Sequence, residues 1–375
     1  MRILVLNHEY PPVGGGGGKA CQDIAEELAR RGHGLVILTS YFRGLPREEK
    51  TAGVRVIRLN AMRREQARAG LVTMKMYILG AFVKGLSIIR SWMPELIHVH
   101  FAVPAGAAAY LLNRITGIPY VITAHLGDIP GGSPHKTAGW FRVIYPLTRA
   151  VWMRASGVTT VSSFTAELIQ EHYQVQPTVI PNGITVRGQR ELPGHTPPVI
   201  LFAGRFVEQK NLTVFMDVME KLRDHKWTCV MLGDGPLRAE VMARIDRSGL
   251  KECFSLPGWV SPQFVSQHMD QSDILFMPSL YEGLPVVGVQ ALDAGLAIVA
   301  SNVGGFNDVV EQGKNGFLCP PQDRDGFCES LTSLLSNGDA LQQARKHSLR
   351  VAEKFEIQRV VDEYEKVFLS IVHQD

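Results

Sequence analysis

The 375-residue sequence has only five cysteines, and they are scattered along the chain. Cys21, Cys229, Cys253, Cys319 and Cys328 form no Cys-x-x-Cys pair and no Cys/His cluster. The sequence therefore predicts neither a disulfide framework nor a structural zinc site. Unpaired cysteines are typical of a reducing compartment, so we expect a cytoplasmic protein.

Long apolar runs are also missing. The first one, Ile3–Leu6, is too short for a signal peptide, and we expect it to form a buried strand. The most apolar stretch, Leu71–Ile89, is interrupted by Lys75 and Lys84. The sequence therefore predicts no membrane-spanning helix.

A strong net charge is absent as well, but the charge is unevenly distributed. The chain carries +3 overall. Residues 1–190 hold 22 basic and 11 acidic residues, a net of +11, whereas the remainder has a net of −8. Two interpretations remain open: one half meets an anionic surface, or the two halves attract each other across a cleft.

Short apolar runs alternate with helical patterns through most of the chain. In the first half they are Arg2–Leu6, Leu35–Thr39, Val54–Leu59, Leu96–His100, Tyr120–Ala124, Gly157–Val161 and Thr178–Pro181, with helices such as Ala20–Arg31 and Ala105–Thr116 between them. After a Pro/Gly-rich segment the runs are Val199–Ala203, Trp227–Leu232, Phe254–Leu256, Ile274–Met277, Ala297–Ala300 and Gly316–Cys319. Strands that are apolar on both faces and separated by helices predict parallel sheets.

The sequence thus predicts an α/β fold with two Rossmann-like, doubly wound domains and a ligand cleft between them. We expect an N-terminal domain at 1–186, a linker at 187–198 and a C-terminal domain at 199–348. We expect a helical segment at 349–375, packed back on the N-terminal domain.

A glycine run, Gly14–Gly18, follows the first strand. Glycines such as Gly15 and Gly16 let backbone N–H groups approach a ligand oxygen. The run is not a Walker A loop, since Val13 and Ala20 occupy the required Gly and Ser/Thr positions. A flexible loop without a ligand is the alternative.

Two segments of the second half predict an anion site. Arg205 and Lys210 bracket the start of a helix, which suits a pyrophosphate, although solvated surface cations are the commoner fate of such residues. Glu282 precedes a predicted helix at about Val286, and Gln290 follows within it. A carboxylate beside a helix N-terminus favours a sugar–phosphate compound over a bare phosphate.

His125 ends a buried strand, at the position where a ligand of the cleft would lie. It could donate a hydrogen bond to a sugar hydroxyl, but a lone histidine is more often structural.

The segment from Arg55 to Trp92 is both basic and apolar. Its basic residues are Arg55, Arg58, Arg63, Arg64, Arg68, Lys75, Lys84 and Arg90. This composition suits a helix on an anionic membrane surface, and equally a pair of core helices with solvated basic faces. We expect no nucleic-acid role, because no aromatic and basic recognition motif accompanies the charge.

Taken in order, the motifs resemble the family-four retaining glycosyltransferases over nearly the whole chain. They are Pro11-Pro12 with the glycine run, Thr123-Ala124-His125, Ile180-Pro181-Asn182-Gly183, Gly204-Arg205 with Lys210, Gly233-Asp234-Gly235-Pro236, Gly258-Trp259-Val260, Pro278-Ser279 with Glu282-Gly283-Leu284-Pro285, and Asn315-Gly316-Phe317-Leu318.

The resemblance implies the GT-B fold and transfer of a sugar from a UDP- or GDP-linked donor. It implies retention of anomeric configuration, with no metal and no other cofactor. Arg205 and Lys210 would hold the donor diphosphate, Gly15 and Gly16 would approach it, and His125 would contact the sugar. The remaining donor-binding positions would be Gly233, Val260, Glu282, Gly283, Leu284, Val286 and Gln290, with His125 and Glu282 as the catalytic pair.

Two positions depart from the family pattern. Gln290 stands where a second glutamate binds the ribose, and Thr185 stands where an acidic residue is usual. The amide of Gln290 loses charge assistance worth about 1–1.5 kcal/mol, or roughly tenfold in donor affinity.

We expect the acceptor to be a surface polysaccharide or a lipid-linked glycan, with the enzyme on the inner face of the membrane. The alternatives are a sugar-nucleotide binder without activity and a sugar-nucleotide epimerase. The epimerase would need paired acid and base groups, and we find none in the sequence.

Overall fold

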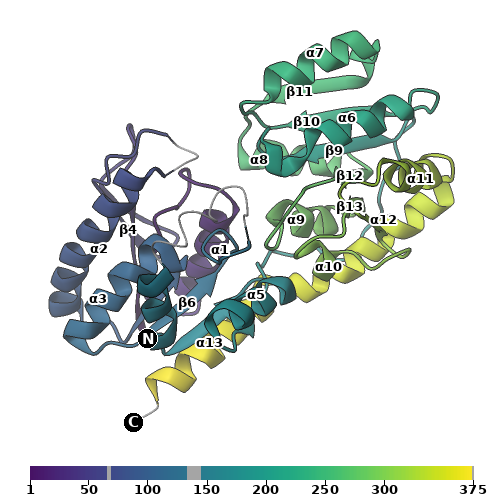
Figure 1. Cartoon of the computed structure of the whole chain (residues 1–375). Coiled ribbons are helices and arrows are strands. Elements are labelled where there is room, and N and C mark those ends of the chain that lie inside the picture. Colours follow the sequence, from purple (N-terminus) through teal and green to yellow (C-terminus); the bar gives the residue numbers. More distant parts are fainter. Residues whose placement is uncertain (66–68, 133–144, 374–375) are drawn as a thin grey trace. The chain divides into compact units, whose positions relative to one another are not determined.

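The computed structural model describes residues 1–65, 69–132 and 145–373. The chain forms two compact units, which we call unit 1 (Met1–Gly183 with Ile357–Asp375) and unit 2 (Ile184–Glu356) (Figure 1). It crosses between them at 183/184 and 356/357, where we had expected boundaries at 186 and 349.

Unit 1 contains an eight-stranded sheet in the described residues. In spatial order its strands are β3 (Glu48–Thr51), β4 (Val54–Leu59), β2 (Gly34–Ser40), β1 (Arg2–Leu6), β5 (Leu96–His100), β6 (Tyr120–Ala124), β7 (Gly157–Thr160) and β8 (Thr178–Val179). All neighbours pair in parallel except β3, which runs antiparallel to β4 at the edge. The sequence analysis missed β3, because its Glu-Glu-Lys-Thr run has no apolar face.

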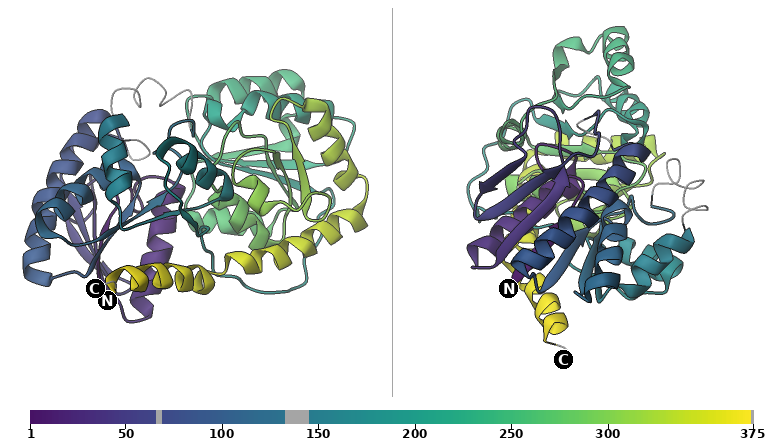
Figure 2. Two further views of the ribbon diagram at one scale, coloured as in Figure 1. Left: turned by 60° about the horizontal axis from the view of Figure 1, so that its bottom comes forward. Right: turned by 90° about the vertical axis from the view of Figure 1, so that its left-hand side faces the viewer.

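Helices cover both faces of this sheet. They are α1 (Gly16–Arg30), α2 (Leu71–Trp92), a short turn η1 (Ala102–Gly106), α3 (Ala107–Thr116), the helical residues 145–154, α5 (Ser163–Tyr173) and α13 (Ile357–Val372). Alternate residues of β1 serve two cores, since Leu4 and Leu6 face α2 and α3 whereas Ile3 and Val5 face α1 and α13. Figure 2 shows these helix pairs on opposite faces.

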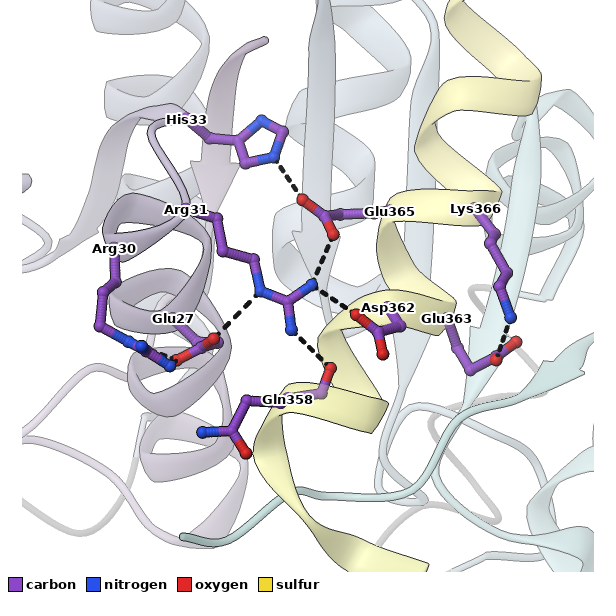
Figure 3. Close-up of polar contacts among 9 residues, drawn as sticks. All are labelled: Glu27, Arg30, Arg31, His33, Gln358, Asp362, Glu363, Glu365 and Lys366. Carbon is purple, nitrogen blue, oxygen red and sulfur yellow. Dashed lines mark hydrogen bonds and ion pairs between the residues drawn. The ribbon is translucent and has the colours of Figure 1, made fainter.

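Helix α13 returns to unit 1 from the far end of the sequence and packs on α1. Arg31 Nη1 donates to Asp362 and to Glu365, both at 2.6 Å, and Nη2 donates to the carbonyl oxygen of Gln358 (Figure 3). His33 contacts the other oxygen of Glu365 at 2.6 Å. Below these polar contacts, Val360, Val361, Tyr364 and Phe368 are buried in the core with α1.

Unit 2 contains a six-stranded sheet of parallel neighbours. Its order is β11 (Phe254–Gly258), β10 (Thr228–Leu232), β9 (Val199–Ala203), β12 (Ile274–Met277), β13 (Ala297–Ser301) and β14 (Gly316–Cys319). Its helices are α6 (Leu212–Lys221), α7 (Arg238–Ser248), α8 (Pro262–Asp270), α9 (Val286–Ala294), α10 (Phe306–Val309), α11 (Arg324–Leu335) and α12 (Gly338–Ala352), with the short turns η2 (Glu208–Lys210), η3 (Lys251–Cys253) and η4 (Glu353–Phe355).

The segment 187–198, expected to be a linker, is fastened to unit 2. The backbone N–H and the Nε of Arg187 donate to Asp293 at 2.8 and 2.6 Å, and its other nitrogens donate to Asp270. Leu192 is buried. The segment has no helix or strand, as its Pro/Gly content predicts. It is part of unit 2 and not a free linker, because these ion pairs attach it to that unit.

Candidate functional site

The centre of the unit 2 sheet is a topological switch point. From β9 the chain continues outward through β10 and β11, whereas from β12 it continues in the opposite direction through β13 and β14. Ligands of doubly wound sheets bind beyond the carboxyl ends of the strands at such a point. Arg205 and Lys210 follow β9, and Glu282 follows β12.

The structure brings Lys210 and Glu282 into direct contact. Lys210 Nζ donates to Glu282 Oε1 at 2.5 Å, and the two side chains are only 13% and 9% exposed. Two further bonds join the same loops: Leu280 N–H donates to the carbonyl oxygen of Gln209 at 2.8 Å, and Gln209 Nε2 donates to that of Tyr281 at 3.0 Å. Lys210, which we predicted to bind the diphosphate, and Glu282, which we predicted to bind the sugar, thus lie in one site.

Arg205 adds a second cation to this edge of the sheet. It is partly exposed, and none of the ion pairs in the described part of the chain engages its guanidinium. Its guanidinium is therefore available to bind an anion such as a diphosphate, which carries more negative charge than Lys210 alone can neutralise.

Helix α9 contributes backbone donors. Its N-cap, Pro285, offers no side-chain acceptor to the amides of the first turn, which begins at Val286. Gly283 and Leu284 are buried just before it, and Gln290 lies one turn further along, partly exposed. The helix start is an anion-binding feature with Glu282 as its nearest acidic neighbour in sequence.

Glycines pack the loops of this site against each other. A Cβ at Gly304 would lie 1.8 Å from the carbonyl oxygen of Glu282, and one at Gly305 would lie 2.1 Å from that of Gly283. Gly233, a predicted donor-binding residue, is buried in the same way against the carbonyl oxygen of Gly204, at 1.9 Å. The structure thus gives Gly233 a supporting role under the Arg205 loop.

Val260 lies between β11 and α8 and is partly exposed. Strand β11 is the edge strand, two places from β9. Gly233 N–H donates to the carbonyl oxygen of Gly258 at 2.9 Å, which connects this edge loop to the loop that follows β10.

In unit 1, the structure gathers the glycine run and His125 at the carboxyl ends of β1 and β6. Gly16–Gly18 form the first turn of α1, which begins four residues before the expected start at Ala20. A Cβ at Gly17 would lie 2.5 Å from Phe101 Cζ and 3.4 Å from His125 Cγ, so only glycine allows this approach. Gly15 and Gly16 are exposed, and Gly15 N–H donates to Glu9 Oε2 at 3.1 Å.

His125 belongs to a group of aromatic side chains. Its ring lies 4.6 Å from that of Phe101, which in turn lies 5.2 Å from that of His8. Burial lowers the pKa of His125 to about 3 and that of His8 to about 4, so both rings are neutral at pH 7. A histidine at this position could either donate a hydrogen bond or supply positive charge. Because its ring is neutral, His125 is suited to the hydrogen bond.

His100 fixes the proton of His125. His100 Nδ1 and His125 Nε2 are 3.0 Å apart, and His100 Nε2 has no partner in the described structure. A buried N–H without an acceptor is rarer than an unmet acceptor, so the proton of His100 belongs on Nδ1, donating to His125. His125 then carries its own proton on Nδ1, as a hydrogen-bond donor.

Sequence reasoning missed His100, Phe101 and Asp128. Asp128, buried, accepts from the N–H groups of Ala102 at 2.7 Å and His125 at 3.2 Å, so it joins the two loops. Phe101 and Leu126 have φ values of +72° and +133°, in regions that cost side-chain-bearing residues free energy. The signal available was His-x-His at 98–100, two polar residues in an otherwise apolar strand.

The described residues contain no group of three or more His, Cys, Asp or Glu side chains arranged to hold a metal ion.

Two family descriptions match this chain. Residues 15–183 match the "Glycosyl transferase 4-like domain", and residues 197–337 match "Glycosyl transferases group 1". Together they cover most of both units.

Two relatives with an assigned activity share just over a quarter of the residues in the aligned parts. A 2-deoxystreptamine glucosyltransferase of Streptomyces kanamyceticus is 29% identical over 80% of this chain and 84% of its own length. A glycogen synthase of Mycobacterium tuberculosis is 27% identical over 99% of this chain and 95% of its own length.

Solved structures share the fold. A sucrose-phosphate synthase of Thermosynechococcus elongatus aligns over all of both chains with a TM-score of 0.86 at 18% identity. HepE of Anabaena, in complex with UDP, aligns over 99% of this chain and 100% of its own with a TM-score of 0.78 at 18% identity. The order of the motifs, the two Rossmann-like sheets and the family matches agree: this chain is a glycosyltransferase of the family-four type with the GT-B fold.

Proposed function

We propose that the protein transfers a hexose from a UDP- or GDP-linked donor to a glycan or lipid-linked acceptor, with retention of anomeric configuration and without a metal ion. The observation that carries the proposal is the Lys210–Glu282 contact at the switch point, beside the start of α9. It places a cation for phosphate next to a carboxylate that can bind sugar hydroxyls.

The leaving group is the nucleoside diphosphate, whose charge grows as the glycosidic bond breaks. Lys210, Arg205 and the amides at Val286 stabilise that charge in place of a metal ion. Preorganised donors of this kind act without reorganisation at the moment of reaction, and each is worth about 3–4 kcal/mol in other enzymes.

Glu282 acts on the donor sugar. When a diphosphate takes up Lys210, the carboxylate is released to accept hydrogen bonds from sugar hydroxyls. On unit 1, His125, with a proton on Nδ1, is a neutral donor for a sugar hydroxyl, and the exposed first turn of α1 at Gly15 and Gly16 offers backbone N–H groups to substrate. The leaving phosphate takes the proton of the acceptor on the same face, so no protein base is needed.

The nucleotide is held by backbone near Val260 at the base and by Gln290 at the ribose. One relative is named a glycogen synthase, which supports a glycan acceptor, and another is named a 2-deoxystreptamine glucosyltransferase, which supports transfer of a hexose. We propose a cytoplasmic enzyme on the inner face of the membrane, acting in synthesis of surface polysaccharide or glycolipid.

Thermal shift with UDP, GDP and a panel of nucleotide sugars identifies the donor, because a ligand that binds only the folded state raises the Tm. Transfer is then followed by nucleotide release, and NMR of the product gives its anomeric configuration. We expect Lys210→Ala to lower kcat/KM by about 10²–10³ and EDTA to leave the rate unchanged.

Two results would contradict the proposal. An inverted product would exclude retention, and donor binding without turnover in wild type, Lys210→Ala and Glu282→Ala alike would indicate a sugar-nucleotide binder instead.

A further inference from the structure

The outer face of the α2/α3 layer in unit 1 is both apolar and basic. Helix α2 is 22 residues long, and it is the one described helix with the length and hydropathy to cross a membrane. Only 33% of its most apolar window is buried. Its inner side nevertheless belongs to the core: Tyr77, Ala81 and Ile88 are buried against the sheet, and the Tyr77 hydroxyl donates to the carbonyl oxygen of Leu38 at 2.8 Å.

The side of α2 that faces away from the sheet carries aliphatic residues. At about 3.6 residues per turn, Val72, Leu79 and Val83 lie opposite Tyr77 and Ala81. These three side chains are 60%, 56% and 59% exposed. Lys75 and Arg90 are exposed on the same side, towards the two ends of the helix.

The neighbouring helices extend this face. Helix α3 packs beside α2 (Figure 1). Arg154 of the helical residues 145–154 donates to Asn113 of α3. Exposed apolar residues there are Leu111, Ile115, Leu147 and Met153, and exposed basic residues are Arg114, Arg149 and Arg154. We call α2, α3 and residues 145–154 together the outer helical face.

Acidic residues are nearly missing from this part of the sequence. Helices α2 and α3 and residues 145–154 together hold six Lys or Arg and no Asp or Glu, and the acidic residues between them in the sequence are Glu95 and Asp128. Asp128 is buried between two loops, and Glu95 accepts from the N–H of Arg2 at the amino end of β1. The outer helical face therefore presents one sign of charge around its aliphatic centre.

The structure also corrects the segment chosen from sequence, residues 55–92. Arg58 and Arg63 are buried, with Arg58 bonded to Glu49 and Arg63 bonded to the carbonyl oxygens of His8 and Glu65. Arg68 lies outside the described residues. Arg55 is bonded to Glu48, whereas Arg64 is exposed, so the basic groups that remain for an external partner are Arg64 and those of α2, α3 and residues 145–154.

We propose that the outer helical face docks unit 1 on an anionic lipid surface, with α2 lying in the interface and not crossing it. Aliphatic side chains flanked by Lys and Arg fit acyl chains below anionic headgroups, because long basic side chains reach the headgroups while their stems stay apolar. A second copy of this chain is disfavoured, since two such faces would repel each other. A spanning α2 would have to leave the core around Tyr77.

This inference deepens the proposed location, but it does not depend on the transfer chemistry. Vesicle binding is measured on the full-length protein without donor or acceptor. The protein could therefore fail to bind vesicles and still transfer sugar to a soluble acceptor, or bind vesicles and fail to transfer sugar.

Co-sedimentation with vesicles tests the proposal, using phosphatidylcholine alone and with about one third phosphatidylglycerol. We expect binding to the anionic vesicles only, weakened when NaCl rises from about 0.15 M to about 0.5 M. Lys75→Glu/Arg90→Glu should lower the affinity about tenfold or more. The matched control, Lys346→Glu/Arg350→Glu, reverses two exposed charges one turn apart on α12 of unit 2 and should bind as wild type.

A second pair separates insertion from charge alone. Leu79→Gln/Val83→Gln keeps every basic residue, so we expect any loss of vesicle binding to come from lost contact between these aliphatic side chains and the lipid. Met242→Gln, at an exposed position on α7, is the control and should bind as wild type. Unchanged Tm values and unchanged turnover of a soluble acceptor show that the variants are folded.

Absence of binding, equal binding to both vesicles, or equal loss in the α12 control would overturn the proposal. A concentration-dependent dimer abolished by Leu79→Gln/Val83→Gln would assign the face to a second copy instead.

Discussion

At the scale of single residues, Gln290 stands where the family resemblance implies a second glutamate. We expect Gln290→Glu to tighten binding of the cognate nucleoside diphosphate about tenfold, because a carboxylate accepts a ribose hydroxyl with about 1–1.5 kcal/mol more than an amide does. Isothermal titration with UDP and GDP measures this. Gln312→Glu, at an exposed position on the loop before β14, is the matched control. Equal affinities of wild type and Gln290→Glu would show that position 290 does not contact the ribose.

Gly304 tests the packing beneath Glu282. Its φ is +54°, and a Cβ there would collide with the carbonyl oxygen of Glu282. We expect Gly304→Ala to cost about 3 kcal/mol, of which about 1 comes from the left-handed backbone and the rest from the collision. The Tm should then fall by roughly 6–12 °C, and donor affinity should fall with it.

Gly313→Ala is the matched control for that prediction. Its φ is +72°, yet a Cβ there would meet no atom within 4 Å. It should therefore lose only the backbone contribution, about 2–4 °C in Tm. Equal losses in the two variants would show that the Gly304 contact contributes nothing beyond φ.

At the scale of elements, strand β5 buries two histidines, His98 and His100, and His100 lies beside His125, the residue that follows β6. Burial lowers the pKa of His98 to about 3 and also lowers that of His100. In the unfolded chain these groups titrate near 6.5. Between about pH 6.5 and pH 3 the unfolded state therefore binds more protons, and stability falls as the pH falls.

We expect unit 1 to lose stability below pH 6, by on the order of 1 kcal/mol per pH unit for each of His8, His98 and His125. Melting curves from pH 8 to pH 4 give the total, and hydrogen exchange of β5 and β6 peptides places it in unit 1. His98→Gln should flatten the profile, because it removes one group whose pKa burial lowers. A Tm that is constant down to pH 4 would contradict the prediction.

The strands were predictable from sequence and the site only in part, and both outcomes have physical reasons. Runs such as Leu96–His100 and Ile274–Met277 are apolar on both faces, which fixes a buried parallel strand. The Lys210–Glu282 contact joins residues 72 positions apart. Only the strand order β9–β12 makes them neighbours, and spacing along the chain does not specify that order.

The predicted start of α1 was wrong because glycines disfavour helix. Here Gly17 nevertheless lies in the first turn, because a larger residue would collide with Phe101.

At the scale of the whole molecule, α13 completes unit 1 from the far end of the chain. A chain ending at Glu356 would lack four core side chains, Val360, Val361, Tyr364 and Phe368, and the apolar residues that pack against them would be exposed to water. Burial of each contributes about 1.5–3 kcal/mol, and the sum is comparable to the entire stability of a domain. We expect such a chain to leave unit 1 unfolded, visible as rapid hydrogen exchange in β1 and β2, while β9 and β12 stay protected.

Arg31 and Arg30 give a milder form of the same test. Arg31 is 21% exposed and bonds Asp362, Glu365 and Gln358, whereas Arg30 is 64% exposed and bonds only Glu27 of its own helix among the described residues. Arg31→Ala should cost about 1–3 kcal/mol, and Arg30→Ala less than about 1 kcal/mol. Equal effects in urea titrations would show that these polar contacts do not hold α13.

The return of α13 also sets the order of events during synthesis. Every described strand of unit 1 is made before residue 184, yet the apolar strip under α13 stays uncovered while the ribosome makes all of Ile184–Glu356. At 5–20 residues per second that wait lasts roughly 10–35 s. A nascent chain in this interval leaves Val5 and Ile24 without the cover that α13 provides, so we expect messages cut short before codon 357 to yield products that proteases degrade.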